Sequence, residues 1–207
     1  MSNSQIAASM GVPADDREAL LSFLETRRSV GMTALGEPGP SESELRRILG
    51  IAARVPDHGG IEPWRFIVLA GEARQRASAG VSALYAAENA AMEPERREKF
   101  TAIMGRALTY APVIVLVVSR ADAAARVPAW EQELSAGAAC MNLLVAAQAS
   151  GYGATWLTGW AAYSPGVAEL FGLGEAERVA GIIHIGTAKD IPPDRKRPDL
   201  AAITTYW

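Results

Sequence analysis

Hydrophobic and polar positions along the chain repeat with two different periods, and these separate the expected helices from the expected strands. Apolar residues at helical spacing, with charged residues opposite them, predict amphipathic helices. Short, nearly continuous apolar runs predict strands, and strands that alternate with helices indicate a mixed α/β layer structure. The pattern predicts helices at residues 15–26, 41–55, 72–89, 95–108, 131–149 and 166–171, and strands at residues 64–70, 113–119, 156–158, 181–186 and 203–207.

Local signals mark several of these boundaries. Ser41 with Glu44 three residues later forms a capping box, which predicts the start of a helix. Ser164 followed by Pro165 is the cap-then-proline signature of another helix start. Gly151 is expected to be the left-handed cap that ends the long apolar helix.

Two segments are expected to be enclosed by the rest of the protein. The β-branched run at residues 113–119 predicts a central strand buried on both faces. The helix predicted at residues 131–149 is hydrophobic almost all round, so either a core or a subunit interface must cover it. Trp64 is expected to anchor the start of its strand in the core.

The two ends of the chain differ from the middle. Residues 1–14 are expected to form a flexible leader, and residues 15–207 a single domain. A Pro- and charge-rich arm at residues 189–198 leads to the aromatic pair Tyr206 and Trp207. This apolar end either extends across a partner subunit and joins its sheet, or folds back on its own core.

Composition narrows the class of protein. A net charge of −3 gives no sign of a nucleic-acid or membrane partner, which normally shows as a strongly basic face. Cys140 is the only cysteine, so no internal disulfide is possible and a reducing compartment fits. The chain has neither a signal-peptide pattern nor an apolar run long enough to cross a bilayer. We therefore expect a cytoplasmic protein.

The segment Arg27-Arg28-Ser29 carries the clearest candidate chemistry. Two guanidiniums and a hydroxyl form a natural site for a phosphate dianion, because arginine offers a rigid fork of charge-assisted donors. The alternative is structural: basic residues at a helix C-terminus interact favourably with the helix dipole.

Arg54 and His58 form a second candidate cluster, in the loop before the strand that begins at Trp64. Each also has an ordinary explanation, as a charge at a helix end or as a solvated histidine. No set of residues has metal-ligand spacing, and no nucleophile, acid–base pair, P-loop or dinucleotide fingerprint is present. No catalytic side chain is assigned, so demanding chemistry would fall to a cofactor.

Taken together, the motifs resemble those of the nitroreductase family of flavin enzymes, particularly its small single-domain branch. The resemblance runs from about Leu20 to the C-terminus. The matching segments are 27–29, 53–58, 62–64, 111–112, 127–133, 135–137, 151–153, Trp156 and 186–187.

The resemblance implies an α+β fold, a three-layer sandwich with a central mixed sheet flanked by helices, and a homodimer that exchanges its C-terminal arms. It also implies two FMN sites at the dimer interface, each built from both subunits. By position, Arg27, Arg28 and Ser29 would hold the FMN phosphate and ribityl chain, Trp156, Leu157 and Thr158 would lie along the flavin, and Arg54 and His58 would reach in from the other subunit.

The implied activity is that of an FMN-dependent oxidoreductase, with NAD(P)H as co-substrate and a nitroaromatic or quinone as electron acceptor. Leu157 stands where this branch often has Arg, and Glu62 where Gln is common. These departures favour one alternative, a flavin-binding dimer with little turnover. Because one fold can host varied chemistries, a specialised flavin dehydrogenase of a biosynthetic intermediate is a second alternative.

Overall fold

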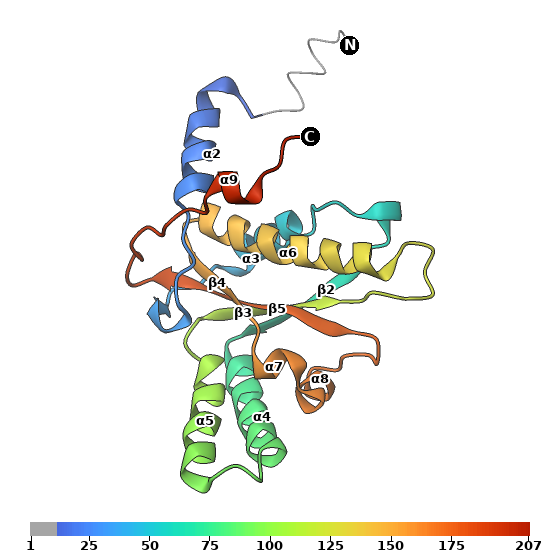
Figure 1. Cartoon of the computed structure of the whole chain (residues 1–207). Helices are drawn as coiled ribbons and strands as arrows, with labels where there is room; N and C mark the ends of the chain where they lie inside the picture. The colour runs from blue at the N-terminus through green and yellow to red at the C-terminus, as the bar shows by residue number, and fades with distance from the viewer. Residues whose placement is uncertain (1–11) are drawn as a thin grey trace. The chain divides into compact units, whose positions relative to one another are not determined.

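The computed structural model describes residues 12–207 of the chain (Figure 1). The chain divides into two compact units, Met1–Arg28 with Ile191–Trp207, and Ser29–Asp190. Most of the leader expected at residues 1–14 lies outside the described residues.

The first unit contains helix α2 (Ala14–Thr26) and the short helix α9 (Leu200–Ile203). Helix α2 ends where the sequence predicted. Arg197 ties the C-terminal arm to it, because its Nη2 donates a hydrogen bond to the carbonyl oxygen of Glu25 at 2.6 Å. The strand expected at residues 203–207 does not form in this chain: Ile203 ends α9, and residues 204–207 have no regular secondary structure.

The second unit is built on one sheet, in which every strand pair is antiparallel. Strand β5 (Arg178–Ala188) is central and pairs with β3 (Val113–Ser119) along one edge and with β4 (Gly153–Leu157) along the other. Strand β2 (Trp64–Ala70) pairs with β3, and the two-residue β1 (Leu35–Gly36) pairs with the end of β5.

The sheet is therefore antiparallel within this chain rather than mixed as expected. The connection between β2 and β3 explains why. It consists of α4 (Glu72–Glu88) and α5 (Pro94–Ala107), two helices that pack against each other and return the chain to the end of the sheet from which it left. Ala70, the last residue of β2, consequently lies opposite Val113, the first residue of β3.

Helices cover both faces of the sheet, which gives the expected three layers (Figure 1). Helices α3 (Glu42–Ala52) and α6 (Ala129–Ala149) pack on one face. Helix α4, with the short helices α7 (Trp160–Tyr163) and α8 (Pro165–Leu170), packs on the other.

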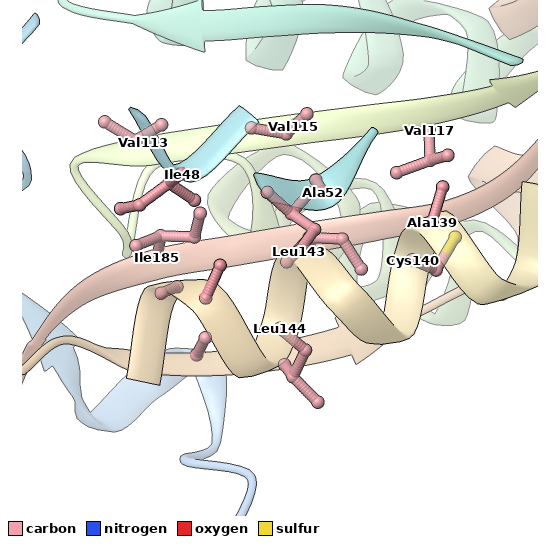
Figure 2. Close-up of a cluster of buried hydrophobic side chains, with 14 of the residues drawn as sticks. Ile48, Ala52, Val113, Val115, Val117, Ala139, Cys140, Leu143, Leu144 and Ile185 are labelled. Atoms are coloured by element: carbon pink, nitrogen blue, oxygen red, sulfur yellow. The ribbon is translucent and has the colours of Figure 1, made fainter. Parts of the chain in front are cut away.

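Strand β3 is buried along its whole length, as predicted. Side chains of a strand point alternately to the two faces, so Val115 and Val117 join the core under α3 and α6, while Ile114 joins the core under α4. Figure 2 shows the first of these cores, where Leu143 of α6 meets the sheet. Trp64 is buried in the same core, which confirms its anchoring role.

The local signals are also confirmed. The Ser41 hydroxyl accepts the Glu44 amide at 3.3 Å, and the Glu44 carboxylate accepts the Ser41 amide at 2.8 Å. The Ser164 hydroxyl caps α8, and Gly151 has a φ of 89° after α6. No helix in the described part of the chain combines the length and apolarity needed to cross a membrane.

Candidate functional site

Arg27 and Arg28 lie in the first unit, directly after the last turn of α2. The Arg27 amide closes the helix by donating to the Phe23 carbonyl oxygen at 2.9 Å. Asp194 lies nearby in the arm, and its pKa is lowered chiefly by a hydrogen bond from Arg197, with a further contribution from the positive charge of Arg28. The two arginines thus lie at the end of a helix, a position that fits either a phosphate site or a favourable interaction with the helix dipole. Arg28 has an acidic neighbour there, Asp194.

Ser29 and the residues of β4 belong to the second unit and follow one another along its edge. The Val30 amide donates to the Ala154 carbonyl oxygen at 3.0 Å, which places the exposed Ser29 beside the start of β4. At the other end of the strand, Leu157 is half-buried and Thr158 is exposed. Strand β4 begins earlier than the predicted residue 156, because Gly153 already pairs with β5.

The Trp156 side chain packs against β5. Its indole N–H donates to the Ala180 carbonyl oxygen at 3.2 Å, and 37% of the residue remains exposed. Gly181 makes this packing possible, since a Cβ at that position would collide with the indole ring and lie 2.9 Å from the Cys140 sulfur. Sequence reasoning missed this role of Gly181, although a glycine within an apolar strand often marks a close approach.

Arg54 and His58 lie on the exposed loop between α3 and β2. Within the described residues, no acidic side chain forms an ion pair with Arg54. His58 begins a 3-10 turn (His58–Gly60), and its Nδ1 lies 2.7 Å from Oε2 of Glu131 at the start of α6. The role of Glu131 was not predicted from the sequence.

These candidate residues are split between two edges of the sheet. Ser29 and residues 156–158 border β4, whereas the loop that carries Arg54 and His58 leads into β2. Strands β5 and β3 lie between, so the two edges are three strand spacings apart, roughly 14 Å. The two groups thus border different strands of the sheet.

The same loop contains a half-buried carboxylate, Asp57, that sequence reasoning also missed. Oδ2 of Asp57 accepts the Glu62 amide at 2.8 Å, and the Glu62 carbonyl oxygen accepts the Trp64 amide at 2.7 Å. Glu62 has a φ of 49°, which is unusual for a residue with a side chain. Asp57 therefore holds the turn that directs the exposed Glu62 side chain outward.

The two remaining groups that could carry chemistry are structural. Cys140 is fully buried, and burial raises the pKa of its thiol to about 12, so the thiolate nucleophile is not available at neutral pH. His184 is buried in β5, and burial lowers its pKa to about 4, so it is neutral. No group of three or more potential ligands within the described residues could hold a metal ion.

The family model of the nitroreductases matches residues 24–187, which include all eight candidate residues. The chain belongs to the nitroreductase family. It is 38% identical over 188 residues to an Escherichia coli K12 protein named "Putative NAD(P)H nitroreductase YdjA", and the match covers 90% of this chain and 98% of that protein.

Solved structures show the same fold. A nitroreductase-like family protein from Bacillus cereus superimposes with a TM-score of 0.78 at 24% identity, over 91% of this chain and 95% of its own. A nitroreductase from Desulfovibrio desulfuricans, solved in complex with FMN, gives a TM-score of 0.69 at 23% identity over 91% and 96% of the two chains.

Proposed function

We propose that this protein is an FMN-dependent oxidoreductase that uses NAD(P)H to reduce an electrophilic acceptor such as a nitroaromatic or a quinone. Family membership carries the proposal, and the relatives support it. The E. coli relative is named for NAD(P)H nitroreductase activity, and the Desulfovibrio structure holds FMN.

The chemistry of the candidate residues fits FMN. Two guanidiniums and a hydroxyl in consecutive positions suit a phosphate dianion. Strand β4 of the second unit adds an aromatic ring, that of Trp156, which is half-exposed and donates a hydrogen bond to the Ala180 carbonyl oxygen. An anionic end and a flat heterocycle are the two parts of FMN that such a set would recognise.

The protein would therefore bind and orient the cofactor rather than donate or accept protons. Arg27, Arg28 and Ser29 would hold the phosphate and ribityl chain, and residues 156–158 would lie along the flavin. Bound FMN would supply the capacity to accept hydride from NAD(P)H and to pass it on to the acceptor.

We further propose a homodimer, because the candidate residues lie at two separate edges of one chain. The surface of α6 supports this. Trp130, Leu134 and Met141 form an exposed apolar stripe along α6, with exposed fractions of 68%, 54% and 38%, while the opposite side of the helix is in the core. A second copy packed on this stripe explains a helix that is apolar all round.

The C-terminal arm fits the same assembly. Tyr206 and Trp207 at its end are fully exposed. In the proposed dimer each arm crosses to the partner subunit. The buried Cys140 fits the reducing environment of the cytoplasm, where we propose that the enzyme works.

The visible spectrum of the purified protein tests this function. We expect bound FMN, or its uptake when it is supplied, and rapid bleaching by NADH or NADPH under anaerobic conditions. Protein that binds no FMN would refute the proposal. Bound flavin that neither nicotinamide reduces would instead indicate the flavin-sequestering alternative.

A further inference from the structure

A carboxylate of α6 faces the ring of His58, and it belongs to Glu131. Its carboxylate Oε2 lies 2.7 Å from Nδ1 of His58, within hydrogen-bonding distance. An ionised carboxylate can only accept hydrogen bonds, so in the neutral imidazole the proton must be on Nδ1. Nε2 of His58 then keeps its lone pair and can accept a hydrogen bond from another group.

Two further side chains of α6 hold the rest of the same loop. The Ser135 hydroxyl donates to the Pro56 carbonyl oxygen at 2.9 Å. The Asn142 side-chain amide donates to the carbonyl oxygens of Ile51 and Arg54, at 2.5 and 3.2 Å. Every contact reaches a backbone oxygen or a ring atom, so together they fix where the loop runs.

The spacing of these residues shows that α6 serves two purposes. Glu131, Ser135 and Asn142 are four and seven residues apart, so they lie within about 40° of one another around the helix. The apolar stripe of Trp130, Leu134 and Met141 has the same spacing one residue earlier, which places it about 100° further round. One flank of α6 thus holds the loop, and the next flank faces the proposed second subunit.

We propose that Glu131 is a positioning residue of the flavin site, which acts by holding His58 with Nδ1–H turned toward its own helix and Nε2 offered to the FMN bound by the partner subunit. Ser135 and Asn142 hold the backbone that carries His58 and Arg54. This inference rests on the proposed FMN function. A neutral acceptor at Nε2 suits a hydroxyl or a ring N–H of FMN, whereas a protonated imidazole could accept from neither.

The tautomer of His58 can be observed directly. The chain has two histidines, so ¹⁵N spectra of the imidazole groups at about pH 8.5, where ordinary histidines are neutral, contain few signals. We expect an Nδ1–H tautomer for His58, assigned by its loss in His58→Ala. Glu131→Gln should convert it to a mixture, because a Gln side chain can donate or accept. An Nε2–H tautomer in the wild-type protein would overturn the proposal.

A double-mutant cycle on FMN affinity, measured by quenching of flavin fluorescence, tests the link to the cofactor. We expect His58→Ala to weaken binding about tenfold and Glu131→Gln about threefold or more. In the His58→Ala background, Glu131→Gln should have no further effect. Glu98→Gln, an exposed substitution on α5, is the matched control and should leave both affinity and tautomer unchanged.

Additive losses in the cycle would show that Glu131 acts other than through His58, and would overturn the inference alone. A wild-type protein that takes up no FMN would contradict the proposed function and the flavin role of Glu131 with it. The tautomer measurement does not require bound FMN, so the two failures are distinguishable.

Discussion

Gly181 illustrates how a single residue shapes the candidate site. It lies in β5 directly under the indole of Trp156 and beside the sulfur of Cys140. A side chain there would displace the ring and lengthen its hydrogen bond to Ala180. The identity of residue 181 therefore determines where the aromatic surface of the site lies.

We predict that Gly181→Ala lowers the free energy of unfolding by about 1–3 kcal/mol, as overpacking in a core usually does, and also weakens FMN binding. Urea unfolding and flavin titration measure the two effects. Gly50→Ala is the matched control: this glycine is exposed in α3 with open space around it, so alanine should stabilise the helix by about 0.5–1 kcal/mol. Unchanged stability and affinity in Gly181→Ala would contradict the packing described here.

His184 should make the protein sensitive to acid. Burial lowers its pKa to about 4, below the ordinary 6.5, so protonation favours the unfolded chain. Stability is complete above about pH 6.5 and is lost as the pH falls toward 4. The difference corresponds to about 3 kcal/mol in the free energy of unfolding.

The comparison between wild type and His184→Leu isolates this effect. We predict a smaller loss of stability for the variant between pH 6.5 and pH 4, measured by urea unfolding at each pH. Parallel curves for the two proteins would show that His184 does not contribute. The change in unfolding free energy between the two pH values is compared for the two proteins, so the contribution of all other titrating groups cancels to a first approximation.

At the scale of single residues, candidate site residues that are adjacent in the sequence could be predicted, whereas contacts between residues far apart in the sequence could not. Arg27, Arg28 and Ser29 are adjacent, so their combined chemistry could be recognised directly. Glu131 lies 73 positions from His58, and no local pattern reports that contact. Such a pair becomes visible only when α6 and the loop after α3 are folded against each other.

At the scale of elements, the periodic segments were predictable and the edges of the sheet were not. Strand β3 and helix α6 have uniform apolar patterns, and both were predicted close to their observed bounds. Strand β4 begins earlier than predicted and ends before Thr158, and β5 extends beyond both predicted ends, because pairing with a neighbour, rather than local composition, sets their length. For the same reason the residues after Ile203 form no strand in a single chain.

The exposed stripe of α6 leads to a prediction for this element. Leu134→Glu should raise the dissociation constant of the proposed dimer about a hundredfold or more. Leu134 is exposed in the single chain but would be buried in the proposed interface, where a charge is costly. Sedimentation velocity measures the change, and FMN binding should fall with it. Ala102→Glu places the same charge on the exposed side of α5 and should leave the dimer intact. A Leu134→Glu protein that remains dimeric would place the interface elsewhere.

At the scale of the whole molecule, the antiparallel sheet keeps the two groups of candidate residues apart. Ser29 and residues 156–158 border one edge, and Arg54 and His58 lie on the loop that enters the other. The sequence motifs indicated both groups, but the distance between them depends on the strand order, which follows from the helical hairpin between β2 and β3. The FMN site proposed above draws on both groups, and we propose that two copies of the chain share it.

Mixed dimers test this proposal most directly. One chain carries Arg27→Ala and Ser29→Ala, and the other carries Arg54→Ala and His58→Ala. Each pure dimer should bind FMN weakly at both sites, because each lost charged hydrogen bond reduces the binding free energy by about 1.5–3 kcal/mol. In the mixed dimer one site collects all the substitutions and the other none. Titration of the isolated mixed dimer should then show one tight FMN site per two chains, and a mixed dimer with no tight site would contradict a site shared between subunits.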